Sequence, residues 1–470
     1  MGLQRSLSLI RGAYAAAATK SSLFPLEWSR AVSFSTGVEL HTSALSNSTA
    51  SGSGSSSAIR RRGGSSKAQE EDDHMEFPGG KVPFTPALEF RGGHFTPHQP
   101  IPCYRTLDSG GAALEGAAAP HDLDQETAVK LYQTMVALQT VDTIFYEAQR
   151  QGRFSFYMTS SGEEATAVGS AAALTLDDVV FSQYREQGVL MWRGFSFKDM
   201  ANQCFGNMHE QGKGRQMPIH YGSRELNFHT ISSPLATQLP HAVGAAYCLK
   251  LDKKPAVSAV YFGEGAASEG DFHAALNFAA TLGAPVLFIC RNNGWAISTP
   301  ATEQYRGDGI AGRGPSYGIA TIRVDGGDAR AMYNATAEAR AVALRQQAPV
   351  LIEAMSYRSG HHSTSDDSSR YRASEEMRAW RARDPVSRFQ RWLLGQGWWS
   401  EAQDAELRQA CRKEVIKALQ TAQEAPKAPL SDLFTDVYDE LPPHLVEQRA
   451  ELFDFVARHP DVCPADIPVK

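Results

Sequence analysis

Cysteine is scarce in this sequence, and its copies are not paired. The six cysteines among 470 residues are scattered and include no Cys-x-x-Cys pair, so zinc ribbons and disulfide frameworks are not expected and a reducing compartment is the default. No apolar run reaches the roughly 18 residues that a membrane-spanning helix needs. The net charge of −6 leaves no basic surplus, which argues against a nucleic-acid partner.

Acidic residues are rare in the first part of the chain, where serine, alanine, glycine and basic residues dominate. The basic residues there are Arg5, Arg11, Lys20, Arg30, Arg60, Arg61 and Arg62, and the acids are Glu27 and Glu39. This composition predicts a mitochondrial transit peptide over residues 1–65, and therefore a protein of the mitochondrial matrix. The alternative is a plain disordered tail.

The rest of the chain divides into three parts. Residues 66–120 are rich in proline and glycine and predict an extended N-terminal arm. Residues 121–372 alternate short apolar runs with helical patterns, which predicts an α/β domain with a parallel sheet flanked by helices. Residues 373–470 predict a helical C-terminal region with a structural role. In such parallel sheets, ligands bind at the carboxyl ends of the strands.

Two motifs follow neighbouring predicted strands. The strand over 256–262 leads into Gly263-Glu264-Gly265, and the strand over 285–290 leads into Asn292-Asn293. Glycines allow a ligand to approach the backbone, and a helix start favours a phosphate. A carboxylate and an amide oxygen, with a backbone carbonyl, are hard ligands that suit Mg²⁺ together with diphosphate oxygens. A glycine-rich turn and a polar Asn-Asn-Gly turn are the structural alternatives.

Longer stretches around these motifs resemble a known family. They are "SFYMTSSGEEATAVGSAAAL", "FSQYREQGVLMWRG", "ISSPLATQLPHAVGAAYC", "RNNGWAISTP" and "YRSGHHSTSDDSSRYR". They are similar to the alpha subunits of branched-chain 2-oxoacid dehydrogenases, and the resemblance runs from about residue 90 to the C-terminus. It implies the thiamine-diphosphate-binding fold of the diphosphate-binding type, with thiamine diphosphate, Mg²⁺ and K⁺ as cofactors.

The resemblance also implies roles for individual residues. Glu264 and Asn293 would bind Mg²⁺ through their side chains, and Trp295, where tyrosine is usual in the family, would bind it through its carbonyl. The other residues implied to lie near the cofactor are Gln183, Tyr184, Arg185, Ser233, Leu235, Gly265, Ala266 and Arg291. A K⁺ site would be formed by Ser232, Pro234, Thr237 and Gln238. Arginine forks suit a diphosphate, although most arginines are solvated surface residues.

The loop after the strand over 349–355 contains the implied catalytic residue, His362. A histidine titrates near neutrality and can donate a proton or stabilise charge, and the family associates this one with acyl transfer to a lipoyl group. His361 is expected to be structural, and Arg358 to face the chemistry beside His362. Ser363 matches a regulatory phosphorylation site, whereas a second such site of the family falls at Ala373, which cannot accept phosphate.

Asp366 and Asp367, in the same loop, are expected to hold its shape by accepting hydrogen bonds from nearby N–H groups. The loop as a whole is expected to form a mobile wall of the cofactor channel.

The expected reaction needs partners. In this superfamily a glutamate from a separate pyrimidine-binding domain activates the cofactor, and the helical region after Arg372 does not predict such a domain. A beta subunit in an α2β2 heterotetramer is therefore expected, together with a lipoyl-bearing acyltransferase core. A regulatory kinase and phosphatase are further candidate partners.

Three alternatives stay open at this point. The substrate could be pyruvate or a broad range of 2-oxoacids, although pyruvate enzymes usually carry Asp in the Gly-x-Gly position and lack the Asp-Asp-Ser-Ser run of the histidine loop. The chain could be a scaffold without activity, against which Glu264, Asn293 and His362 are all present. An unrelated nucleotide-binding protein is disfavoured because no Gly-x-x-x-x-Gly-Lys-[Ser/Thr] loop occurs.

Overall fold

The structure is a computed structural model of the chain and describes residues 74–77, 80–83, 85–88, 99–121 and 123–469. The predicted transit peptide, residues 1–65, lies outside the described residues. The strands are β1 (His74–Phe77), β2 (Gly80–Pro83), β3 (Cys103–Tyr104), β4 (Val179–Phe181), β5 (Ser258–Gly263), β6 (Val286–Asn292), β7 (Trp295–Ala296), β8 (Thr299–Pro300), β9 (Ala320–Asp325) and β10 (Val350–Met355). The helices are α3 (Gln125–Arg150), α4 (Glu164–Ala172), α5 (Gln187–Trp192), α6 (Phe197–Phe205), α7 (Gln238–Leu251), α8 (Gly270–Leu282), α9 (Ala301–Gln304), α10 (Ala329–Gln346), α11 (Ser374–Arg381), α12 (Pro385–Gln396), α13 (Glu401–Glu424) and α14 (Pro443–Arg458).

A six-stranded sheet in the order β3-β9-β10-β6-β5-β4 lies at the centre of the fold. Each neighbouring pair of strands runs parallel. The predicted parallel sheet flanked by helices is therefore confirmed. None of the described helices is both long and apolar enough to cross a lipid bilayer.

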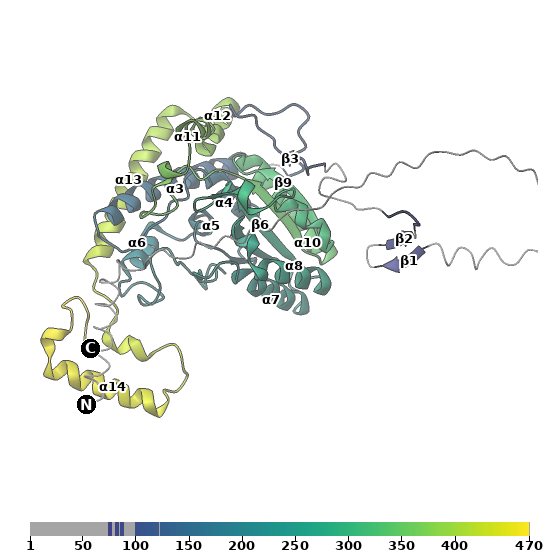
Figure 1. Cartoon of the computed structure of the whole chain (residues 1–470). Helices are drawn as coiled ribbons and strands as arrows, with labels where there is room; N and C mark the ends of the chain where they lie inside the picture. Colours follow the sequence, from purple (N-terminus) through teal and green to yellow (C-terminus); the bar gives the residue numbers. More distant parts are fainter. Residues whose placement is uncertain (1–73, 78–79, 84, 89–98, 122, 470) are drawn as a thin grey trace, which may run out of the picture. The chain divides into compact units, whose positions relative to one another are not determined.

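Helices cover both faces of this sheet (Figure 1). Residues of β5 and β6 alternate between two hydrophobic clusters, because successive side chains of a strand point to opposite faces. Val260 and Phe288 pack with α7 and α8 on one face, whereas Tyr261 and Ile289 pack with α4, α5 and α10 on the other. A strand buried on both faces is apolar at nearly every position, which explains why these runs are readable from the sequence.

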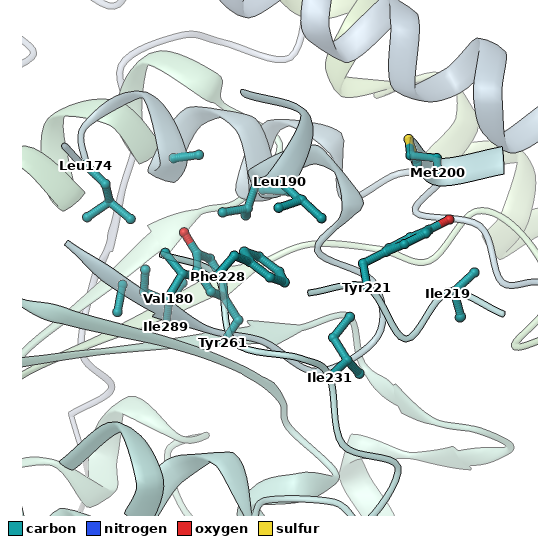
Figure 2. Packing of buried hydrophobic residues seen from close by; sticks show 14 of the residues in the cluster. Leu174, Val180, Leu190, Met200, Ile219, Tyr221, Phe228, Ile231, Tyr261 and Ile289 are labelled. Carbon is teal, nitrogen blue, oxygen red and sulfur yellow. The ribbon is translucent and has the colours of Figure 1, made fainter. Parts of the chain in front are cut away.

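Figure 2 shows the second cluster at close range. Val180, Tyr261 and Ile289 rise from the strands and pack against Leu190 of α5. The Tyr261 hydroxyl lies 2.9 Å from the Ser170 hydroxyl of α4, so its polar end is satisfied within the apolar layer. This packing fixes the sheet against the helices and holds the ends of the strands in place.

Helix termini carry residues that are typical of such positions. Asp124 caps α3 by accepting a hydrogen bond from Thr127 N at 2.7 Å, and Asp384 caps α12, which has Pro385 in its first turn. Gly283 ends α8 with a left-handed φ of 59°. A short 3₁₀ turn, Ala266–Ser268, follows β5, and α8 begins at Gly270.

The C-terminal region is helical as predicted, and α12 and α13 pack into the body of the fold. Val415 and Leu419 of α13 belong to the cluster that contains α3 and the sheet, and Phe389 and Trp392 of α12 pack with the other end of α3. These two helices are thus part of the core and not an appendage on it. The predicted division at residues 120 and 372 remains a prediction.

The predicted arm contributes to the sheet. Cys103 and Tyr104 form β3, which pairs with β9 at the sheet edge. Beyond it, Asp328 accepts hydrogen bonds from Thr106 N and Leu107 N, both at 2.6 Å. Described residues of the arm are therefore fastened to the α/β body by backbone pairing and by a buried carboxylate, which the proline- and glycine-rich composition did not reveal.

Candidate active site

Four adjacent parallel strands end at one edge of the sheet, and each is followed by predicted site residues. β4 leads into Gln183–Arg185, β5 into Glu264, β6 into Asn293, and β10 into the loop of His362. Parallel neighbours present their carboxyl ends at the same edge, so the topology brings together residues that are far apart in sequence. A hydrogen bond from Gly263 N to Gln183 Oε1 at 2.7 Å links the ends of β4 and β5.

Glu264 and Asn293 lie at the ends of neighbouring strands, as expected. Both side chains are buried, and Glu264 N donates to the carbonyl of Arg291 on β6. Burial raises the pKa of Glu264, and one of its oxygens, Oε1, has no hydrogen-bond partner among the described residues. A buried carboxylate oxygen without a donor is costly unless a cation binds it.

Asn292 and Asn293 have different hydrogen-bond partners. Asn292 is the last residue of β6, and its amide donates to Glu353 Oε1 at 2.7 Å and to the Tyr305 hydroxyl at 2.9 Å. Asn293 donates instead to Glu163 Oε1, while its own Oδ1 accepts from Trp295 N at 3.1 Å. The Asn292 side chain is thus engaged with Glu353 and Tyr305, and the choice of Asn293 as the metal ligand of the pair remains a prediction.

Gly265, next to Glu264, packs closely against Ala296. A Cβ atom at this position would lie 2.7 Å from the Cβ of Ala296, which is too close for any side chain. Ala266, the next residue, is buried in the 3₁₀ turn that precedes α8. The turn thus has the small residues that a diphosphate against its backbone would require.

Arg291 forms buried ion pairs that were not predicted from the sequence. Its Nη1 donates to Glu163 Oε2 at 2.7 Å, and its Nε donates to Glu186 Oε1. Burial opposes the charge of Arg291, but Glu186 and Glu163 raise its pKa overall. Both acids occur in the motifs that carry the family resemblance. The sequence offered one sign of these ion pairs: each acid stands next to a buried segment, and a buried acid requires a partner.

Arg185 connects β4 to the histidine loop. Its Nη1 donates to the carbonyl of Thr159 at 2.5 Å, and its Nη2 donates to the carbonyl of His362 at 2.6 Å. Its guanidinium also lies 5.5 Å from the ring centre of Tyr184, and the rings of Tyr184 and His362 make an edge contact at 6.1 Å. Tyr184 and Arg185 therefore hold His362 at the edge of the sheet.

The protonation of His362 differs from the expectation. Burial, with Arg185 and Arg358 nearby, lowers the pKa of His362 to about 3. The expectation that it titrates near neutrality is wrong in this environment, because the cationic form has lost water and faces two guanidinium groups. His362 is neutral at physiological pH.

The tautomer of His362 also follows from its contacts. Nδ1 lies 3.1 Å from Arg185 Nη2 and 3.3 Å from Arg358 Nη1, and guanidinium groups can only donate. Nδ1 must therefore accept, which leaves the single proton on Nε2. His362 can act as a neutral hydrogen-bond donor through that atom.

Two aspartates order the histidine loop, as predicted. Asp366 accepts from His362 N at 2.7 Å and from the Tyr371 hydroxyl at 2.5 Å, and Asp367 accepts from Ser369 N at 3.2 Å. Arg358 links this loop to the turn between β7 and β8 by donating to the Ile297 carbonyl at 2.8 Å. The loop that follows β10 is thereby joined to the β7–β8 turn.

His361 and Ser363, on either side of His362 in the chain, make contacts of their own. His361 lies 2.9 Å from the Ser368 hydroxyl and lines a cavity of about 720 Å³ with Asp142 and Glu164, so it does not share the position of His362. Ser363 is buried, and its hydroxyl lies 3.0 Å from that of Ser365. A modifying enzyme would reach Ser363 only after the loop opens.

The loop before α7 holds the residues of the predicted K⁺ site. Thr237 Oγ1 donates to the Pro234 carbonyl at 3.2 Å and lies 3.4 Å from the Ser232 hydroxyl, so three of the oxygens are gathered around a left-handed Ala236. Gln238 turns its amide nitrogen to the Tyr261 carbonyl at 3.0 Å, which ties the loop to β5.

The two residues expected near the aminopyrimidine lie on this same loop. The Ser233 hydroxyl lies 2.7 Å from His220 Nε2, and the Leu235 side chain is exposed. Their cofactor role remains a prediction.

The donor set fits a divalent cation held by mixed ligands. Among the described residues, no group of three or more His, Cys, Asp or Glu side chains is placed to hold a metal ion. A cation at this edge would therefore use Glu264 with amide and carbonyl oxygens from Asn293 and Trp295. The free Glu264 oxygen, together with the amide and carbonyl oxygens, fits a magnesium ion.

Comparison with known proteins gives consistent matches. Residues 132–431 match the family model of the dehydrogenase E1 component. The chain is 55% identical over 396 residues to 2-oxoisovalerate dehydrogenase subunit alpha 2, mitochondrial, of Arabidopsis thaliana, covering 84% of this chain and 83% of that protein. It is 54% identical over 388 residues to the mitochondrial alpha subunit of the same name from Homo sapiens, covering 82% and 86%. The match from Caenorhabditis elegans is 54% identical over 386 residues and covers 82% and 89%.

Proposed function

The chain belongs to the dehydrogenase E1 component family, and we propose that it is the alpha subunit of a branched-chain 2-oxoacid dehydrogenase. Its activity is the thiamine-diphosphate-dependent oxidative decarboxylation of branched-chain 2-oxoacids such as 3-methyl-2-oxobutanoate, in the breakdown of valine, leucine and isoleucine. The acyl unit passes to the lipoyl group of an acyltransferase core. The relatives are named for 2-oxoisovalerate, which favours this substrate class over pyruvate.

The observation that carries the proposal is the unpartnered carboxylate oxygen of Glu264 beside Asn293, at the carboxyl ends of β5 and β6. Glu264, the Asn293 side chain and the Trp295 carbonyl would hold Mg²⁺. Gly265 and Ala266 would lie against the diphosphate, with Arg185 and Arg291 as the nearby cations. Ser232, Pro234, Thr237 and Gln238 would bind K⁺, and Ser233 and Leu235 would contact the aminopyrimidine.

The chain's own residues bind, orient and hold protons around the cofactor. When bound, thiamine diphosphate supplies the carbanion that adds to the 2-oxo group and the cationic ring that accepts the electrons released with CO₂. Neutral His362 holds a proton on Nε2 and can donate a hydrogen bond toward the reacting carbonyl or the diphosphate. Gln183 and Tyr184, beside β5 and His362, line the space next to it.

A beta subunit supplies the remaining machinery in this proposal. It contributes the glutamate that activates the aminopyrimidine, in an α2β2 heterotetramer located in the mitochondrial matrix. Ser363 is a candidate for control by a kinase and a phosphatase, because a phosphate next to His362 would add negative charge where the diphosphate and the lipoyl domain approach. The relatives' printed names include mitochondrial, which supports the location.

Substrate choice tests the proposal. The alpha chain co-purified with a beta subunit should release CO₂ from 3-methyl-2-oxobutanoate with a kcat/KM at least about tenfold above that for pyruvate, since a missing branched alkyl group is worth roughly 1–3 kcal/mol of binding. The measurement is a steady-state assay with both acids, Mg²⁺ and thiamine diphosphate. A preference for pyruvate would assign the chain to the alternative substrate.

A further inference from the structure

Glu163 is a buried acid whose side chain has no role in its own helix. It occupies the residue before α4 but makes no side-chain cap hydrogen bond there. Its side chain is 1% exposed, which makes an unpaired charge at this position untenable. The contacts that satisfy it all come from β6 and the loop after it.

Both carboxylate oxygens of Glu163 are engaged, each with a different residue. Oε1 accepts from Asn293 Nδ2, and Oε2 accepts from Arg291 Nη1 at 2.7 Å. Arg291 is also held independently by Glu186. If Glu163 were replaced, Arg291 would still be paired with Glu186. The Asn293 amide nitrogen, in contrast, has Glu163 as its acceptor.

This contact determines which way the Asn293 amide faces. A carboxylate oxygen can only accept, so the atom that faces Glu163 must be the amide nitrogen. The amide oxygen then points away, where it accepts one N–H, that of Trp295, and keeps a lone pair for a second partner. Glu264, with its free oxygen, follows the adjacent strand.

We propose that Glu163 is a positioning residue for the divalent cation, because it turns the Asn293 amide so that the oxygen is presented to the metal. The inference deepens the proposed function and rests on it. Residues that orient metal ligands typically change metal affinity by about 10- to 100-fold when replaced. Glu163 is therefore expected to act on Mg²⁺ affinity and not on the chemical step.

The test compares two adjacent substitutions in the alpha–beta complex. In E163Q the side-chain volume is kept, but an NH₂ group replaces one carboxylate oxygen. This NH₂ group must face the donor of either Asn293 or Arg291, so one of the two hydrogen bonds is lost. E164Q is the matched control, because Glu164 bonds to Gly162 N and Gln139 and touches neither Arg291 nor Asn293. The probe is MgCl₂ titrated at fixed thiamine diphosphate, with binding followed by calorimetry and by tryptophan fluorescence.

The expected result is a half-saturating Mg²⁺ concentration raised about 10- to 100-fold in E163Q and unchanged in E164Q. At saturating Mg²⁺, kcat of E163Q should return to within a few-fold of wild type. An unchanged half-saturation, or a loss of kcat that Mg²⁺ cannot restore, would overturn the inference.

A charge-swapped variant separates positioning from folding. In E163Q/N293D the amide and the carboxylate exchange places, so the introduced glutamine can donate to the introduced aspartate and accept from Arg291, and either oxygen of that aspartate can bind the cation. This double variant should bind Mg²⁺ more tightly than E163Q, and a failure to recover would show a merely structural role. Wild-type protein that binds no thiamine diphosphate with Mg²⁺ would overturn the proposed function itself, whereas normal wild-type binding with an unaffected E163Q overturns this inference alone.

Discussion

At the scale of single residues, Glu264 combines a cost in stability with a capacity to bind. Its side chain is almost fully buried, burial raises its pKa, and its Oε1 atom has no hydrogen-bond partner among the described residues. Protein interiors rarely keep such a group without a reason. A cation bound at this oxygen would satisfy the group, so stability and binding should respond oppositely to its replacement.

Glu264→Gln should make the cofactor-free protein more stable and should abolish Mg²⁺-dependent binding of thiamine diphosphate. The neutral amide removes a buried charge, which we expect to raise the free energy of unfolding by about 1–2 kcal/mol. The loss of the anionic ligand should weaken cofactor binding by more than about 100-fold, beyond the effect of residues that only orient ligands. Thermal unfolding without cofactor and calorimetric titration with it measure the two effects. A destabilised variant that still binds normally would contradict the assignment.

The sequence predicted which residues form the site better than it predicted their protonation and their ion-pair partners. Apolar runs and glycines located the strand ends that precede Glu264, Asn293 and the loop of His362, and the family resemblance selected Asn293 and His362. The pKa of His362, about 3, could not be predicted, because it depends on burial and on two arginines brought in from different strand ends. Likewise, the Glu163 that pairs with Arg291 lies 128 residues away in the chain, and no spacing pattern announces such a pair.

At the scale of elements, the start of α4 contains an acid that is held protonated. Glu164 is fully buried; burial, followed by the charge of Asp384 at the start of α12, raises its pKa to about 8. Gln139 of α3 donates to both carboxyl groups, at 3.1 Å to Glu164 and 3.2 Å to Asp384. Asp142, which is itself buried, adds to the same effect. The protonated Glu164 therefore lies where α3, α4 and α12 come together.

Glu164→Gln should stabilise the protein increasingly as the pH rises from 5 to 8. The unfolded glutamate releases its proton near pH 4.5 and the folded one near pH 8, so between these values stability falls with rising pH by up to about 1.4 kcal/mol per unit. Glutamine has no proton to lose and escapes this decline. Thermal unfolding midpoints of both proteins across this pH range provide the check. A difference that does not change with pH would refute the buried proton.

Element boundaries were predictable where one strong local signal existed. The helix from Asp124 and the strands buried on both faces have such signals in caps and apolar runs. β3 has only two residues, and its pairing with β9 depends on tertiary contact, so the arm was predicted as merely extended. For the same reason the packing of α12 and α13 into the core followed only from the structure.

At the scale of the whole molecule, the described chain provides one half of the expected catalytic apparatus. The six-stranded sheet presents the diphosphate side of the proposed site, and the α-helices α11–α14 come after its last strand, β10. The glutamate expected to activate the aminopyrimidine has no assigned position among these residues. In the proposed function, a second subunit supplies this glutamate.

Reconstitution tests this requirement most directly. Purified alpha chain, a purified beta subunit and their mixture are each supplied with Mg²⁺, thiamine diphosphate and carboxyl-labelled 3-methyl-2-oxobutanoate, and labelled CO₂ is measured. We expect release of labelled CO₂ from the mixture alone, and no release when the mixture contains the Glu264→Gln alpha chain. Turnover by the alpha chain alone, or full activity of the Glu264→Gln mixture, would contradict this expectation.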